Sequence, residues 1–242
     1  MLWGTFGIVH ISSLILAVFL NVALYFAIKN LSEKKQIVIL GLFSLLGMSA
    51  IIFNLIHWGS PLEYLPFHLC SLNALILPFA VFFKNKILGN ILLLWSFGAI
   101  FALVVNHAQA NFEIFSSTFF FYYFPHVFEI GIPFIMFKLK LIKKDHKCIL
   151  STLLITFASY TLIHLINVAL NGYFIKNNVL DWAGNIVQVN YMFSTTPENP
   201  LLQLFYNIVP YPYWYMLLTI PIIAVYLTIM YLPQIIKRGK EN

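Results

Sequence analysis

The sequence predicts an all-α fold: a polytopic membrane protein with seven transmembrane helices, its N-terminus outside and its C-terminus in the cytoplasm. Two observations support this prediction. The chain of 242 residues is 61% hydrophobic and only 9% charged, whereas soluble domains carry about 25% charged residues. Its apolar residues also gather in long runs that short, lysine-rich segments separate, which is typical of a multi-pass membrane protein.

Seven runs are long enough to cross a membrane, because a hydrocarbon core about 30 Å thick needs roughly 20 apolar residues per helix. They are residues 6–28, 36–57, 67–83, 87–106, 116–137, 148–170 and 213–236. The third run is the shortest and most polar, and the fifth contains Pro125 and Pro133, which predict a kink. No internal repeat or second domain is visible, so residues 1–242 are predicted to form a single integral membrane domain.

Basic residues decide the predicted orientation. Those that lie between spans one and two, three and four, and five and six, or after span seven, are Lys29, Lys34, Lys35, Lys84, Lys86, Lys138, Lys140, Lys143, Lys144, Lys147, Lys237, Arg238 and Lys240. The opposite loops hold one basic residue, Lys176. The positive-inside rule places the basic side in the cytoplasm. The net charge of +6 is therefore a topology signal, and no nucleic-acid partner is expected.

The long loop 171–212 lies on the outer side in this topology. It carries several prolines and aromatic residues, among them Trp182, Pro210 and Pro212. A loop of this length is usually functional or disordered, and aromatic side chains favour the membrane interface. We expect an ordered cap that lies on the membrane surface.

Polar residues inside the predicted spans gather towards the outer side. The histidines that do so are His10, His57, His68, His107, His126 and His164. A single interfacial histidine also suits the headgroup region without any function. His126 and Glu129 lie deeper and share one helix face at i, i+3, and an ionisable pair at that depth is by default a functional-site hypothesis. We expect a polar pocket within the bundle that opens outward.

Cys70 is the candidate nucleophile of this pocket. A thiolate attacks carbonyl carbons, and a neighbouring imidazole takes its proton. Cys70 lies one turn into its predicted helix, where the helix dipole favours an anion, and Asn73 follows one turn later. Asn73, His68 or nearby backbone N–H groups would hold an oxyanion, and Glu129 would orient the histidine. A free cysteine in a membrane helix also serves as a small apolar filler, so the spacing leaves both interpretations open.

Other functions fit the same residues less well. Six histidines suggest a metal site, but they are spread one per span without an H-x-x-E-H or H-E-x-x-H motif, so no metal and no cofactor is expected. A retinal-binding protein needs a lysine within a span, and the seventh span has none before Lys237. A transporter needs polar groups across the whole membrane, whereas the polar residues of this chain gather towards the outer side. A non-catalytic transporter or small-ligand receptor that uses the same pocket stays as the alternative.

Three segments carry a resemblance to a known family. "LPFHLCSLNALILPF", "FYYFPHVFEIGIP" and "VNYMFSTTPENPLLQLFYNIVPYPYWYMLL" resemble the YwaF-like bacterial integral membrane proteins, which are similar to the TMEM164 family. The resemblance covers most of the chain, from about the second span to the seventh. The chain departs from the usual pattern at Ser194, Thr195 and Thr196, which replace apolar and basic residues, and at Tyr211 and Tyr213, where tryptophans are common.

The resemblance implies an acyltransferase that acts on phospholipids through a cysteine acyl-enzyme and a histidine. The cysteine corresponds to Cys70 and the histidine to His126. His68 corresponds to another recurrent histidine, and Asn190 and Tyr191 to the "NYM" element. With Glu129, Asn73 and His164, which are polar residues of the predicted spans, these residues form the predicted site. We expect a lipid acyltransferase or ester hydrolase of a bacterial cell membrane, with a membrane phospholipid as its substrate.

Overall fold

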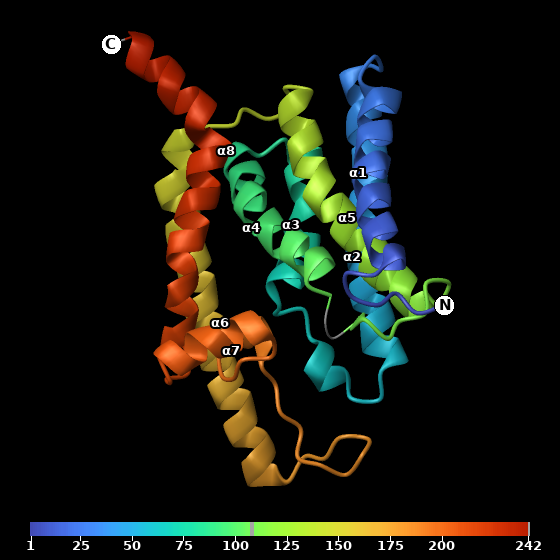
Figure 1. Ribbon diagram of the computed structural model, residues 1–242, viewed down its shortest axis with the longest axis vertical. Helices are drawn as coiled ribbons and strands as arrows, with labels where there is room; N and C mark the ends of the chain where they lie inside the picture. Colours follow the sequence, from blue (N-terminus) through green and yellow to red (C-terminus); the bar gives the residue numbers. More distant parts are fainter. Residues whose placement is uncertain (107–108, 242) are drawn as a thin grey trace. The chain divides into compact units, whose positions relative to one another are not determined.

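The computed structural model describes residues 1–106 and 109–241 (Figure 1), so His107 lies outside the described residues. The prediction of an all-α membrane protein is confirmed. The α-helices are α1 (Ile8–Ile28), α2 (Glu33–His57), α3 (Leu69–Phe83), α4 (Lys86–Val104), α5 (Ser117–Lys138), α6 (Ile149–Asn177), α7 (Pro200–Ile208) and α8 (Ile220–Glu241). Short 3-10 helices lie between them at η1 (Pro61–Tyr64), η3 (His146–Cys148), η4 (Tyr191–Phe193) and η5 (Trp214–Thr219).

Six helices in the described part of the chain are long and apolar enough to cross a membrane, so the chain is a multi-pass membrane protein. The matching segments are Ile8–Ile28, Glu33–His57, Lys86–Val104, Ser117–Lys138, His146–Asn177 and Trp214–Gln234. Helix α3 is apolar but has only 15 residues, which rise about 22 Å at 1.5 Å each. That is shorter than a hydrocarbon core of about 30 Å. The count of seven spans and the orientation of the bundle therefore stay predictions.

A helix occupies each of the seven predicted runs, with differences at the ends. The third helix begins at Leu69, so His68 precedes it. The sixth continues to Asn177, where Asn178 ends it in the left-handed conformation with φ of 50°. The segment predicted as a cap loop, 171–212, contains the end of this helix and the whole of α7. Leu202 and Phe205 form the buried face of α7.

Side-chain caps explain where three helices begin. The Asn85 side chain accepts hydrogen bonds from the backbone N–H groups of Ile87 and Leu88, both at 3.0 Å, at the start of α4. Ser116 and Asn199 cap α5 and α7 in the same way. Such caps satisfy backbone donors that have no partner within the helix.

The chain folds as two compact units, and each is described by itself. Unit 1 comprises residues 1–53 and 69–144, and unit 2 comprises residues 54–68 and 145–242. The prediction of one integral membrane domain stays a prediction.

Helix α5 is the centre of unit 1, because it packs against α1, α3 and α4 (Figure 1). The core of unit 1 includes the fully buried residues Leu40, Leu92 and Ile132. Helix α2 approaches α3 closely at Gly47, where an added Cβ would lie 2.6 Å from the Ala74 Cβ. Because glycine has no side chain, the backbones of α2 and α3 can approach each other closely here, as helices in membrane bundles often do at small residues.

The N-terminal segment closes one end of unit 1. Trp3 is 1% exposed, and its indole N–H donates to the Ser13 hydroxyl at 2.8 Å. Its backbone N–H donates to the Phe112 carbonyl at 2.9 Å. The segment therefore belongs to the folded core of unit 1.

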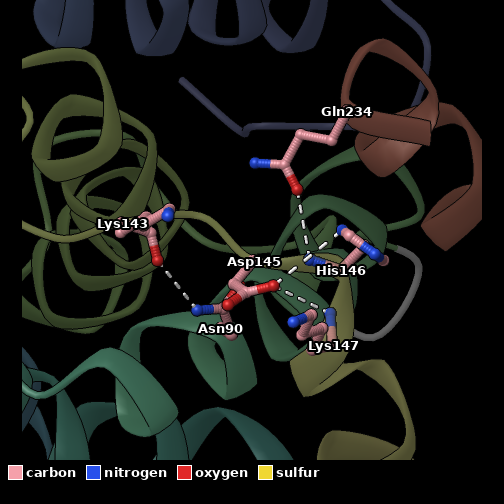
Figure 2. A network of polar contacts seen from close by, with 6 residues as sticks. All are labelled: Asn90, Lys143, Asp145, His146, Lys147 and Gln234. Atoms are coloured by element: carbon pink, nitrogen blue, oxygen red, sulfur yellow. Dashed lines mark hydrogen bonds and ion pairs between the residues drawn. The ribbon is translucent and has the colours of Figure 1, made fainter. Parts of the chain in front are cut away.

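Polar contacts also order the turns at the ends of helices, as Figure 2 shows. In unit 1, the Asn90 amide donates to the Lys143 carbonyl at 3.3 Å. In unit 2, the Asp145 carboxylate accepts from the Lys147 backbone N–H at 3.0 Å. The His146 backbone N–H donates to Gln234 Oε1 at 3.1 Å, which ties α8 to the turn before α6.

Candidate functional site

Helix α5 places His126 and Glu129 in the interior of unit 1. Their side chains are 7% and 3% exposed. They lie near the middle of a 22-residue helix, where neither water nor a bilayer headgroup is near if the helix spans the membrane. A buried ionisable pair costs free energy unless it is hydrogen-bonded, so the contacts of both side chains are informative.

The His126 ring is held by its own helix. Its Nδ1 atom lies 2.6 Å from the Tyr122 carbonyl oxygen. A carbonyl oxygen only accepts hydrogen bonds, so Nδ1 carries the proton. In the neutral ring Nε2 then has no hydrogen and is free to accept one. The Tyr122 carbonyl therefore fixes the tautomer that a general base needs.

Tyr122 links this histidine to the cysteine. Its ring lies 4.4 Å from the His126 ring, measured between centroids, and its hydroxyl donates to the Ala102 carbonyl of α4 at 3.1 Å. Tyr122 also lies within electrostatic range of both Cys70 and Glu129. Cys70 is a free, half-buried cysteine near the start of α3. These four residues thus belong to one cluster within unit 1.

Asn73 completes the cluster one turn after Cys70. It is 0% exposed, and its Nδ2 atom lies 3.5 Å from Glu129 Oε2. Its Oδ1 atom is buried without a hydrogen-bond partner. On the other side of Glu129, an added Cβ on Gly47 would lie 3.4 Å from Oε1. The carboxyl group is therefore enclosed by α2, α3 and α5.

The structure brings the predicted residues Cys70, Asn73, His126 and Glu129 together, but no hydrogen bond among the described residues joins the Cys70 thiol to His126. Catalytic hydrogen bonds are often long in ligand-free structures and tighten when substrate binds. The cluster offers a thiol, a neutral imidazole with a free nitrogen, and an amide. Nucleophilic acyl chemistry requires these three kinds of group.

His10 has a structural role in the same unit. It is 0% exposed. Its Nδ1 atom accepts from the Phe6 backbone N–H at 2.9 Å, and its Nε2 atom lies 2.7 Å from the Leu103 carbonyl oxygen. Both ring nitrogens are occupied, so this histidine ties α1 to the end of α4 and has no nitrogen free for chemistry.

In unit 2, a polar face of α6 holds the segment that follows the helix. Asn171 and Val189 exchange two hydrogen bonds between the side-chain amide and the backbone, at 2.9 and 2.8 Å. Asn167 and Tyr191 form the same pair of bonds, at 2.8 and 3.1 Å. The two asparagines are four residues apart on the helix and bind residues two apart in the segment that leads into η4. They act as a clamp.

His164 and Ser194 extend this clamp. The Ser194 hydroxyl accepts from Asn167 Nδ2 at 2.8 Å and lies 3.0 Å from His164 Nδ1. Since the hydroxyl already accepts one bond, its own proton is available for Nδ1. Ser194 is 0% exposed, and the two residues before it, Met192 and Phe193, both have positive φ. The predicted site residue His164 therefore contacts the cap segment of its own unit.

His68 and Tyr191 lie together in unit 2. Their rings are 5.4 Å apart, and His68 Nδ1 accepts from the Met192 backbone N–H at 3.3 Å. The Tyr191 hydroxyl donates to the Leu62 carbonyl. Burial raises the pKa of Tyr191 to about 12, so this hydroxyl keeps its proton. His68 thus helps to position the "NYM" element.

Asn190 organises the turn after that element. Its Oδ1 atom accepts from the Thr195 hydroxyl at 2.7 Å and from the Thr195 backbone N–H at 3.0 Å. Its Nδ2 atom donates to Glu198 Oε1 at 2.7 Å. All its described partners are protein groups of the same turn. The predicted residues His68, His164, Asn190 and Tyr191 thus belong to a second cluster, in unit 2.

Sequence reasoning missed three residues that matter for these clusters. The spacing in the sequence does indicate that Tyr122 lies beside His126, since it precedes His126 by one helical turn and an i, i+4 pair shares a face. Asn171 gave a similar signal four residues after Asn167. Ser194 stands out in the sequence only as a departure from a family pattern, and nothing in the sequence places it beside His164.

The model of the TMEM164 family matches residues 5–231, which is most of the chain. Searches of curated proteins and of solved structures found no match.

Proposed function

The chain belongs to the TMEM164 family, and from this premise we propose that it is a membrane-embedded acyltransferase or ester hydrolase that acts on phospholipids. Cys70 is the nucleophile and His126 the general base. The observation that supports this proposal best is the hydrogen bond from His126 Nδ1 to the Tyr122 carbonyl. It leaves Nε2 of a buried, neutral imidazole ready to take a proton, in a cluster that contains the only thiol of unit 1 among the described residues.

The first step forms an acyl-enzyme. His126 Nε2 takes the proton of the Cys70 thiol, and the thiolate attacks the ester carbonyl carbon of the phospholipid. A carbon–sulfur bond forms and the carbonyl oxygen becomes an oxyanion, to which the Asn73 amide donates. The intermediate then loses the glycerol oxygen, which takes the proton back from His126 as a lysophospholipid leaves.

The second step releases the acyl group. His126 Nε2 takes a proton from an acceptor hydroxyl or from water, and that oxygen attacks the thioester carbonyl carbon. The carbon–sulfur bond breaks and the Cys70 thiolate regains its proton from His126. An alcohol acceptor gives acyl transfer, and water gives hydrolysis.

The proposal includes the setting of this chemistry. We place the protein in a bacterial cell membrane as a YwaF-like member, with its N-terminus outside and α3 as a seventh, short span. The pocket then opens to the outer face, and a lipid enters sideways between helices. The positive-inside pattern of the loops supports the orientation.

A product assay tests the proposal. Purified protein in detergent is incubated with a phospholipid that carries labelled acyl chains, with and without a lysophospholipid acceptor, and the lipids are analysed by mass spectrometry. We expect labelled fatty acid or labelled product phospholipid from the wild type and from Cys148→Ala, and none from Cys70→Ala. Equal turnover by Cys70→Ala and the wild type would overturn the cysteine mechanism.

A further inference from the structure

The amide of Asn73 has an unfilled hydrogen-bonding position in the core of unit 1. Its described hydrogen bond runs from Nδ2 to Glu129 Oε2 at 3.5 Å, which is long. Its Oδ1 atom is buried without a partner, and the whole residue is 0% exposed. A buried polar atom without a partner costs about 1–3 kcal/mol. We therefore expect a neighbouring group to donate a hydrogen bond to this oxygen.

Exchanging the two ends of the amide gives this oxygen a partner if Glu129 is protonated. Nitrogen and oxygen of an asparagine side chain are interchangeable by a half-turn, and their assignment depends on the hydrogen-bond network. After the half-turn, the Glu129 O–H donates to Asn73 Oδ1. Both hydrogens of Nδ2 then have no acceptor until an oxyanion forms, and Asn73 lies one helical turn from Cys70, on the same face.

The surroundings of Glu129 favour its neutral form. It is 3% exposed, and the described contacts in this part of the chain give it no lysine or arginine partner. A buried carboxylate without a cation is strongly disfavoured. The groups described around it are the Asn73 amide, the Gly47 backbone, and Cys70 and Tyr122, which carry no positive charge in either protonation state. His126 lies one turn earlier on α5 and is neutral before it takes the thiol proton, with Nδ1 bonded to the Tyr122 carbonyl.

We infer that Glu129 is a protonated positioning residue, which donates its proton to Asn73 Oδ1 and so turns the Asn73 amide N–H groups towards the acyl group on Cys70. This inference rests on the proposed acyl-transfer function. In it, Asn73 is the catalytic oxyanion donor, and Glu129 acts through Asn73 without losing its proton. Neither Asn73 nor Glu129 adds a charge of its own beside the negative charge that forms on the carbonyl oxygen.

A pair of substitutions at Glu129 separates this role from a charged one. In Glu129→Gln, the side-chain N–H donates to Asn73 Oδ1 in place of the acid, so the rate of thioester formation on Cys70 should stay within about threefold of the wild type. In Glu129→Leu, the donor is lost and the rate should fall about 100-fold or more, the usual effect of losing an oxyanion donor. Asn73→Asp, which lacks N–H groups, should be as slow as Glu129→Leu.

The results that would overturn the inference are distinct from those that would overturn the proposed function. If Glu129→Gln is as slow as Glu129→Leu, the residue works as a carboxylate and the inference is wrong. If Glu129→Leu is as fast as the wild type, Glu129 has no positioning role. Absence of any thioester on the wild type would overturn the proposed function and this inference with it.

Infrared spectroscopy gives a readout that does not depend on turnover or on the folding of Glu129→Leu. A protonated carboxyl group in the membrane interior has a C=O stretching band apart from those of carboxylates and amides. We expect such a band in the wild type at neutral pH and its loss in Glu129→Gln. Its absence from the folded wild type would show an ionised Glu129 and would overturn the inference.

Discussion

The carbonyl oxygen of Tyr122 lies 2.6 Å from His126 Nδ1, one turn along the same helix. The tautomer of the proposed catalytic base is therefore set by the backbone of α5 and needs no third side chain. In serine proteases a buried carboxylate performs this task. In this protein the carbonyl does so without adding a buried charge, which suits a low-dielectric interior.

The Tyr122 side chain should support the cluster mainly by packing. Tyr122→Phe keeps the ring beside His126 and loses one hydrogen bond, to the Ala102 carbonyl, so we expect a loss of about 1 kcal/mol in unfolding free energy. Tyr122→Ala removes the ring and should cost about 3–5 kcal/mol. Thermal or denaturant unfolding in detergent measures both. Equal stability of the two variants would contradict this account of the cluster.

Gly47 should tolerate no side chain. Gly47→Ala would place a Cβ 2.6 Å from the Ala74 Cβ and 3.1 Å from its Cα, and overpacking of this kind costs about 1–3 kcal/mol. Gly172→Ala is the matched control, because an added Cβ there meets nothing within 4 Å. The second substitution Ala74→Gly should restore part of the stability lost in Gly47→Ala. A Gly47→Ala protein as stable as the control would show that α2 and α3 pack differently.

The Asn167 clamp should order the segment after α6. Asn167→Ala removes its bonds to both backbone groups of Tyr191 and to Ser194, and each buried group left unpaired costs about 1–3 kcal/mol. We expect faster hydrogen exchange and proteolysis between residues 187 and 195. Asn177→Ala, which loses one exposed bond to the Tyr173 carbonyl, should leave both rates unchanged. Unchanged protection in Asn167→Ala would show that the clamp does not hold the segment.

His10 should matter for stability and not for chemistry. His10→Ala leaves the Phe6 N–H and the Leu103 carbonyl without partners, and we expect a loss of about 2–4 kcal/mol in unfolding free energy. Phe115, which is 95% exposed, is the control, and Phe115→Ala should change this free energy by less than about 0.5 kcal/mol. Folded His10→Ala protein should still acylate Cys70 at the wild-type rate. A large loss of that rate in folded protein would give His10 a catalytic part.

The hydropathy of the sequence was enough to locate the long apolar helices, but not the start of α3 or the short helix α7. Apolar runs marked the position of each membrane helix because every bilayer-facing turn needs apolar residues. The start of α3 was less clear, since His68 and Leu69 are adjacent and the boundary depends on backbone contacts such as that of His68 with Met192. The short helix α7 was missed because its nine residues lie in a proline-rich segment with no long apolar run.

The site could be predicted in part for a similar reason. Spacing alone related His126 to Glu129 and Cys70 to Asn73, because i, i+3 pairs share a helix face. It could not show that His68 contacts the Met192 backbone or that His164 contacts Ser194, since these contacts depend on the path of the chain after α6. Nor could it reveal that a carbonyl group, and not a carboxylate, accepts from His126.

The most direct test of the central claim is the mass of the intact protein after brief incubation with phospholipid. We expect an added acyl chain on Cys70, which hydroxylamine removes because the bond is a thioester. The adduct should persist in Cys148→Ala, disappear in Cys70→Ala and form far more slowly in His126→Ala. A wild-type protein that binds the phospholipid but never carries acyl on Cys70 would contradict the claim.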